Sequence, residues 1–153
     1  MDALRISAEH ADVDLDVVHG FLSQDAYWSP GIPRALVEKA VANSLCFSAW
    51  LDGRQVGFAR IAGDRATFGY LADVFVLPDY RGRGISKALV AAAMAHPEVR
   101  GLRRIMLATR DAHAIYAGFG FGAPARPETL MEIHRPGLYQ RGPTQDGDDP
   151  AGG

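Results

Sequence analysis

A short segment rich in glycine and arginine, Arg81-Gly82-Arg83-Gly84, joins a strand-like run to a helix-like run. Glycine allows backbone N–H groups to turn toward a ligand without a Cβ clash, and the N-terminus of the following helix carries partial positive charge. An arginine guanidinium adds a full charge and can bind phosphate through two parallel hydrogen bonds. The segment at 81–86, here called the glycine–arginine loop, is therefore predicted to bind an anion. A pyrophosphate is its natural ligand.

Two well-known phosphate motifs are excluded by the residues around this loop. Gly-x-Gly-x-x-Gly is absent, because position 87 is Lys and position 123 is Ala, and Gly-x4-Gly-Lys-Ser/Thr does not occur. With 17 glycines in the chain, a Gly-x-Gly pair alone carries little information. A solvated turn before a helix is the alternative interpretation of the loop.

The other chemically active side chains form no pattern of a metal site or an activated nucleophile. The five histidines are scattered without the spacing of metal ligands. Cys46 is the only cysteine and lies in a strand-like run, so it is expected to be a buried, small apolar side chain. No metal site is predicted.

Length and composition are those of an ordinary globular domain. The chain has 153 residues, of which 48% are hydrophobic and 22% are charged. A net charge of −2 argues against binding to nucleic acid, and no apolar run is long enough for a membrane span. One cysteine and the absence of a visible signal peptide favour a cytoplasmic location.

Apolar spacing predicts a mixed α/β domain over residues 1–140, in the order β-α-α-β-β-β-α-β-α-β. Strands are expected at 4–7, 45–51, 54–61, 70–76, 104–109 and 131–134, and helices at 14–24, 33–43, 83–95 and 112–118. The pair Asp52-Gly53 predicts a tight hairpin, since both turn residues tolerate positive φ. Residues 141–153 contain no large apolar side chain and are predicted to be a disordered tail.

Two motifs in this arrangement resemble the GCN5-related N-acetyltransferase (GNAT) superfamily. Arg81, Gly84 and Ser86 occupy the fixed positions of the family's phosphate motif, Gln/Arg-x-x-Gly-x-Gly/Ala, with Ser86 as a small departure. The family's second motif, Tyr-x-x-x-Gly-Phe, is matched at 116–121. The resemblance implies a GNAT-type mixed, mainly antiparallel central sheet with flanking helices.

The resemblance further implies binding of acetyl-CoA. In such proteins the strand before the loop offers main-chain groups to the pantetheine arm and the thioester, while the loop N–H groups bind the pyrophosphate. Thr109 stands seven residues before the tyrosine, where the family often has a cofactor-contacting Asn. The residues expected to bind acetyl-CoA are Val74, Phe75, Val76, Arg81, Gly82, Arg83, Gly84, Ile85, Ser86 and Thr109.

The pKa values of the reacting groups indicate which proton transfers the catalyst must assist. An amine with a pKa of ~10.4 is only about one part in 2,500 unprotonated at pH 7, and the departing thiolate benefits from a proton. Tyr116 lies where the family places this acid. Asp73, on the strand beside the expected cleft, is the candidate base, and a carboxylate paired to an arginine is its alternative interpretation. Asp111, expected to cap the 112–118 helix, and His113 are weaker candidates for the base.

The predicted function is acetyl transfer from acetyl-CoA to a primary amine by direct attack on the thioester, with a small molecule as the expected acceptor. Tyr27 and Trp28 join the first two helices, which border the acceptor pocket in this family; covering the sheet edge is their alternative role. A protein lysine or N-terminus as acceptor, and a non-catalytic acetyl-CoA-binding protein, remain open. The oligomeric state is also open, with a homodimer as one option.

Overall fold

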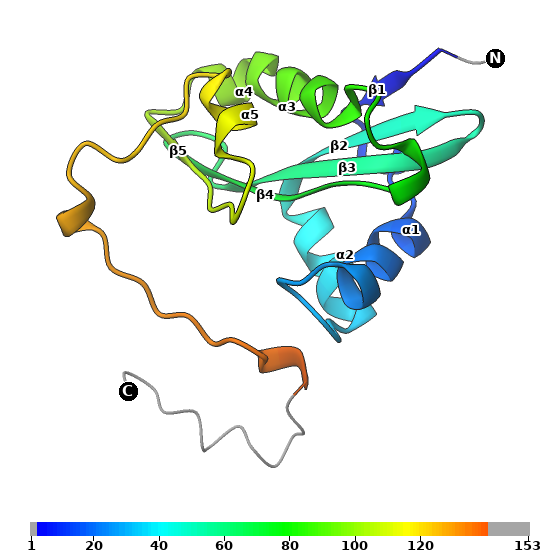
Figure 1. The fold of residues 1–153 in the computed structure, drawn as a ribbon, viewed down its shortest axis with the longest axis horizontal. Helices are drawn as coiled ribbons and strands as arrows, with labels where there is room; N and C mark the ends of the chain where they lie inside the picture. Colours follow the sequence, from blue (N-terminus) through cyan, green and yellow to red (C-terminus); the bar gives the residue numbers. More distant parts are fainter. Residues whose placement is uncertain (1–2, 141–153) are drawn as a thin grey trace.

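The computed structural model describes residues 3–140, which form one sheet with helices on both faces (Figure 1). The strands are β1 (Arg5–Ser7), β2 (Ser44–Leu51), β3 (Arg54–Gly63), β4 (Phe68–Val76) and β5 (Arg104–Met106), in that spatial order. Consecutive strands are antiparallel except β4 and β5, which run parallel. The predicted α/β class with a mainly antiparallel sheet is confirmed.

The helices divide into two layers. They are α1 (Leu15–Gly20), α2 (Arg34–Ala42), α3 (Ile85–Ala95), α4 (Pro97–Arg100) and α5 (His113–Ala117). Figure 1 shows α1 and α2 on one face of the sheet and α3, α4 and α5 on the other. Each layer buries its own apolar cluster against the sheet, because a sheet with two apolar faces must be covered on both.

Local signals in the sequence explain where several elements begin and turn. Asp14 caps α1, since its carboxylate accepts hydrogen bonds from the N–H groups of Asp16 and Val17. The helix then continues as a π-helical turn over Phe21–Asp25, so the single helix expected at 14–24 consists of two segments. The β2–β3 hairpin turns at Asp52 and Gly53 with φ of 54° and 78°, which confirms the predicted tight turn.

The last predicted strand, at 131–134, is wrong for the described residues. Strand β5 is the final strand of the sheet, and the chain after α5 follows an extended path up to residue 140 (Figure 1). Its first part borders β5, and Tyr139 lies next to Gly31 of the α1–α2 connection. The apolar alternation of a strand is present in this segment, but none of the described strands lies beside it to supply hydrogen bonds. The predicted tail at 141–153 lies outside the described residues.

Candidate active site

A cleft opens where β4 and β5 part. The two strands pair only over Phe68–Arg104, Gly69–Ile105 and Tyr70–Met106. Strand β4 continues to Val76, whereas β5 ends at Met106, so the second half of β4 has no strand on that side. A cavity of about 430 Å³ lies here. Its lining comprises Phe21, Asp25, Ala26, Tyr27, Trp28, Val74, Phe75, Val76, Tyr80, Arg81, Gly82, Ile85, Ser86, Val90, Arg110, Asp111, Ala112, Ile115 and Tyr116.

The glycine–arginine loop forms one end of this cleft. Gly82 and Gly84 have φ of 80° and 77°, and a Cβ on either would meet no protein atom within 4 Å. Their backbone conformation therefore favours glycine, and the space above them is open. Within residues 3–140, the backbone N–H groups of residues 82–87 donate to no acceptor. Residues 85–87 already belong to the first turn of α3, where N–H groups have no partner within the helix. The loop thus presents unpaired donors at a helix N-terminus, which suits an anionic ligand.

The arginines of the loop also hold its shape. Nε of Arg81 donates to the carbonyl of Val76 at 3.0 Å and so ties the loop to the end of β4. The Arg83 guanidinium lies over the Tyr80 ring, 5.2 Å from its centroid. These contacts fix the loop beside the strand while leaving positive charge next to the unpaired N–H groups.

Tyr116 stands on α5, across the cleft from β4. Its side chain is half-buried, and its ring packs edge-to-face on Phe121 with centroids 6.1 Å apart. Burial raises the pKa of the Tyr116 phenol above its ordinary value, and the nearby Tyr27 raises it further. The hydroxyl therefore holds its proton at neutral pH, as a proton donor must.

Asp73 has both carboxylate oxygens engaged. Oδ2 accepts from Nε of Arg60 at 2.6 Å, and Oδ1 accepts from the indole N–H of Trp28 at 2.8 Å. The residue lies at an irregularity in the β3–β4 register and has a φ of 55°. This geometry matches the alternative interpretation of Asp73, a carboxylate paired to an arginine, and it ties the α1–α2 connection to the sheet.

The aromatic pair of the α1–α2 connection borders the same cleft. Tyr27 and Trp28 pack edge-to-face at 5.1 Å, and the Arg110 guanidinium lies 3.8 Å from the Tyr27 ring centroid. Trp28 also packs against Phe21, which stacks on Phe75 of β4 at 4.1 Å. The connection is thus linked both to the strand and to the segment before α5.

The structure brings most of the predicted site residues together. Val74, Phe75, Val76, Arg81, Gly82, Ile85, Ser86, Tyr116, Tyr27 and Trp28 line one cleft. Phe75 and Val76 have buried side chains, so their main-chain groups are what the cleft can use. Arg83, Gly84 and Asp73 lie beside the lining residues but not in the lining itself.

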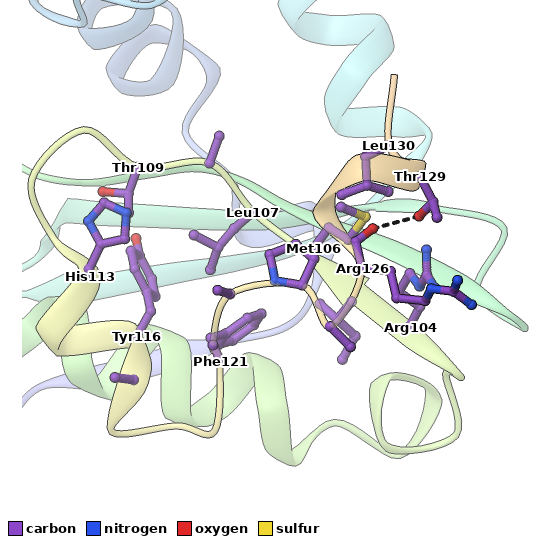
Figure 2. A pocket seen from close by; sticks show the side chains of 17 residues that line it. Arg104, Met106, Leu107, Thr109, His113, Tyr116, Phe121, Arg126, Thr129 and Leu130 are labelled. Atoms are coloured by element: carbon purple, nitrogen blue, oxygen red, sulfur yellow. Dashed lines mark hydrogen bonds between the residues drawn. The ribbon is translucent and has the colours of Figure 1, made fainter. Parts of the chain in front are cut away.

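Thr109 lies elsewhere, in a larger neighbouring hollow of about 740 Å³ (Figure 2). Figure 2 shows Thr109, His113 and Tyr116 at one end of this hollow, so Tyr116 borders both spaces. Oγ1 of Thr109 accepts from the N–H of Ala112 at 3.1 Å. The cap expected from Asp111 is wrong, because Ala112 is the residue that precedes α5 and Thr109 supplies the side-chain acceptor.

Sequence reasoning missed Arg60 and Arg110. Arg60 is needed to neutralise Asp73, and both side chains are largely buried, with relative exposures of 19% and 12%. Arg110 follows β5 and reaches across the cleft to Tyr27. Neither contact can be predicted from the spacing of residues in the sequence, because each joins residues that are far apart in the chain.

The remaining reactive groups give no other site in residues 3–140. Cys46 is 1% exposed, and burial raises the pKa of its thiol to about 12, so it packs as a small apolar side chain. In the part of the chain described, no cluster of His, Cys, Asp or Glu has the arrangement of a metal site. None of the helices between residues 3 and 140 is long and apolar enough to cross a membrane.

Comparison with known proteins assigns the family. A model of the acetyltransferase (GNAT) family matches residues 21–121, which include the glycine–arginine loop and α5. The protein FG08082 of Gibberella zeae, named as an acetyltransferase, is 33% identical over 129 residues, covering 69% of this chain and 71% of that protein. The chain belongs to the acetyltransferase (GNAT) family, whose members use acetyl-CoA, and it is an acyltransferase.

Solved structures agree with this assignment. A crystal structure from Xanthomonas campestris pv. campestris, described as a GNAT-family acetyltransferase, is 53% identical with a TM-score of 0.88, covering 92% of this chain and 99% of that one. A Clostridium acetobutylicum acetyltransferase solved with acetyl-CoA has the same fold, with a TM-score of 0.62 and 17% identity, covering 86% of this chain and 95% of that one.

An Arabidopsis thaliana protein named N-alpha-acetyltransferase MAK3 is 36% identical over 84 residues, covering 50% of this chain and 44% of that protein.

Proposed function

We propose that this chain transfers an acetyl group from acetyl-CoA to a small-molecule primary amine in the cleft between β4 and α5. The observation that carries the proposal is the cleft itself. The unpaired N–H groups of the loop lie at one end of the cleft. The phenol of Tyr116, which carries its proton, and the aromatic border lie at the other end. One elongated substrate could therefore reach both ends.

The loop fits the phosphates of acetyl-CoA. The N–H groups from Gly82 to Ser86 have no acceptor within the described residues, and a ligand can approach Gly82 and Gly84 without meeting a side chain. Charge from Arg81 and Arg83 adds to the helix N-terminus. The pantetheine arm would then follow the free side of β4, where Val74, Phe75 and Val76 have no neighbouring strand.

The reaction is a direct attack. The neutral amine nitrogen forms a bond to the thioester carbonyl carbon, and the carbon–sulfur bond breaks. The sulfur leaves as a thiolate and takes the Tyr116 proton, while the amine releases its own proton to water. The Tyr116 phenolate then regains a proton from water, which restores the acid. General acid catalysis of this kind contributes on the order of 10²- to 10⁴-fold.

The lining of the cleft favours a small acceptor, because aromatic side chains border it on the acceptor side. Tyr27 and Trp28 narrow its border, and Arg110 over Tyr27 holds that border in place. A protein N-terminus is the second candidate acceptor, and the partial likeness to the Arabidopsis N-alpha-acetyltransferase favours it.

Replacing Tyr116 by Phe tests the proposed role of this residue. The variant Tyr116→Phe keeps the ring and its contact with Phe121 but has no proton to donate. We expect kcat to fall by roughly 10²-fold, near the low end for general acid catalysis, with little change in KM for acetyl-CoA. Steady-state thiol release measures both constants.

Phe121→Leu is a suitable control, because it perturbs the packing of the same ring without removing the hydroxyl. Full activity of Tyr116→Phe would remove Tyr116 from the mechanism. A lower affinity for acetyl-CoA with an unchanged kcat would mean that the Tyr116 hydroxyl only helps to bind the acetyl donor.

A further inference from the structure

Arg110 brings a positive charge to the acceptor end of the cleft, and the proposed reaction gives this charge no role. The residue lines the cavity of about 430 Å³ together with Tyr27, Trp28 and Tyr116. It is exposed, and within residues 3–140 its guanidinium forms neither an ion pair nor a hydrogen bond. Five N–H donors on a permanently charged group are therefore available to a ligand in the cleft.

An aromatic ring, and not a counter-ion, holds this guanidinium. Its Cζ lies 3.8 Å from the centroid of the Tyr27 ring. Tyr27 packs edge-to-face on Trp28, whose indole N–H donates to Asp73 of β4 at 2.8 Å. Stacking on a ring uses the face of the planar guanidinium and leaves the N–H groups at its edge free. The border of the cleft thus carries a charged hydrogen-bonding fork that suits a planar anion.

Two carboxylates in the same lining, those of Asp25 and Asp111, do not neutralise Arg110. In the part of the chain that the structure describes, neither forms an ion pair or a side-chain hydrogen bond. Asp111 does not cap α5, because Thr109 accepts from the N–H of Ala112 instead. The acceptor end of the cleft therefore holds charges of both signs that have no partner among residues 3–140.

A ligand with one positive and one negative group complements these charges. An amine with a pKa of ~10.4 reaches the cleft mostly as an ammonium ion, which the two carboxylates attract before it loses its proton. A carboxylate matches the guanidinium, because it accepts two parallel N–H bonds. A phosphate monoester matches less well, since its charge of about −1.5 to −2 would face one arginine and two carboxylates.

We propose that the acceptor is a free amino acid, whose carboxylate binds Arg110 while its amino group lies beside Tyr116 and the thioester. This inference rests on the proposed function and narrows its acceptor to amines that also carry a carboxylate. Arg110 orients the acceptor through the group that does not react. The reaction is unchanged: nitrogen bonds to the carbonyl carbon, the sulfur leaves with the Tyr116 proton, and the amine proton passes to water. Because Arg110 is exposed, solvent limits the effect of the ion pair on kcat/KM to the order of tenfold.

Paired substrates that differ only in the carboxylate test this inference. Thiol release is measured with leucine, phenylalanine and β-alanine, and with the primary amide of each. The amino group of an amide is less basic, so more of it is neutral at pH 7 and basicity alone would favour the amide. We expect the wild-type chain to have a kcat/KM roughly tenfold higher for at least one amino acid than for its amide. Amides that react as well as every amino acid would overturn the proposal and favour a protein N-terminus.

Variants of Arg110 show whether this side chain causes the preference. Arg110→Gln should lower kcat/KM roughly tenfold for the amino acid and far less for the amide. Arg110→Lys keeps the charge without the planar fork and should retain part of the preference. Arg103→Gln is the matched control, because Arg103 is also exposed but lines neither cavity. Equal losses for amino acid and amide in Arg110→Gln would mean that Arg110 only holds Tyr27, and would overturn the proposal.

Calorimetry in the presence of CoA measures the carboxylate contact without turnover. The probes are the N-acetylated forms of the same amino acids and amides. We expect an acetylated amino acid to bind roughly tenfold more tightly than its amide in the wild-type chain, and equally in Arg110→Gln. Such binding by a chain that acetylates no amine would refute acetyl transfer and retain the carboxylate site.

Two further results would contradict the carboxylate site while retaining acetyl transfer. The first is equal Kd values for acetylated amino acids and amides in a wild-type chain that acetylates amines. The second is a higher kcat/KM for phosphoethanolamine than for β-alanine, which would assign the anion to a phosphate.

Discussion

At the scale of single residues, the cleft combines a phenol that keeps its proton, Tyr116, with a carboxylate beside it, Asp73, that is ion-paired with an arginine. Tyr116 is half-buried, and burial keeps its pKa above the ordinary value. Asp73 is held by Arg60 and Trp28. We therefore expect Tyr116 to move a proton and Asp73 chiefly to hold the α1–α2 connection in place.

The pH dependence of kcat follows from the raised pKa of Tyr116. A general acid works only while protonated, which is below its pKa, so raising that pKa extends the active range upward. An unperturbed tyrosine titrates near ~10. The alkaline limb of kcat assigned to Tyr116 should therefore lie above about pH 10, and a limb near pH 8 that persists in Tyr116→Phe would assign it to another group.

The substitution Asp73→Asn separates the positioning role from the role of a base. Loss of the charge leaves Arg60 largely buried without its counter-ion, so the free energy of unfolding should fall by roughly 1–3 kcal/mol. Urea unfolding measures this loss. A positioning role further predicts a higher KM for the amine with kcat reduced less than tenfold.

Trp28→Phe is the matched control for Asp73. It removes the indole N–H that donates to the same carboxylate and keeps an aromatic ring beside Tyr27 and Phe21, so it should raise KM for the amine in the same direction. A fall in kcat of more than 10²-fold in Asp73→Asn, with normal stability and normal activity of Trp28→Phe, would instead assign Asp73 as the base.

At the scale of secondary-structure elements, the parting of β4 and β5 creates the site. The strands separate after the Tyr70–Met106 pair, and a 3-10 turn (Pro78–Tyr80) followed by the glycine–arginine loop connects the end of β4 to α3. The free side of β4 and the helix N-terminus are thus adjacent. One extended ligand can contact main-chain groups of the strand and the loop.

The glycine at position 84 allows a test of the loop. Gly84→Val places a branched side chain where the N–H groups are free, so acetyl-CoA affinity measured by calorimetry should fall at least a hundredfold. Gly53→Val is the matched control, because Gly53 has nearly the same φ, 78° against 77°, and an equally open surrounding in the β2–β3 hairpin. Both variants share the strain of a positive φ, on the order of 1–3 kcal/mol.

Comparison of the two glycine variants isolates the effect on binding. Equal acetyl-CoA affinity in Gly84→Val and Gly53→Val would remove the loop from the binding site. Equal loss of thermal stability in both, with affinity lost only in Gly84→Val, would assign the loop to the ligand.

Local patterns in the sequence were sufficient for most elements and for one wall of the site. Asp52-Gly53 identified a hairpin and Arg81 to Ser86 a loop before a helix, because turn and cap chemistry is local. The strand at 131–134 could not be judged in the same way. Apolar and polar residues do alternate there, but whether a strand forms depends on a neighbouring strand that the sequence does not specify.

The contacts of the acceptor side lay beyond sequence reasoning for the same reason. Trp28 to Asp73, Asp73 to Arg60 and Arg110 to Tyr27 each join separate elements. Such pairs form only once the sheet order and the helix layers are set. The residue types alone could therefore suggest Tyr27, Trp28 and Asp73, but not what holds them.

At the scale of the whole molecule, helices cover both faces of one sheet (Figure 1). The cleft lies where β4 and β5 part. The proposed donor site and acceptor border lie at opposite ends of this cleft. Neither end alone defines an enzyme. The central claim is therefore that both ends serve a single transfer from acetyl-CoA to an amine.

The most direct test of this claim is thiol release from acetyl-CoA by the wild-type chain with a panel of primary amines, alongside a peptide with a free N-terminus. Mass spectrometry of the products measures acetyl transfer in the same samples. We predict that at least one small amine gives equal amounts of free thiol and acetylated amine, at a rate well above that with the peptide. Thiol release that no amine accelerates, or transfer to the peptide alone, would contradict the account.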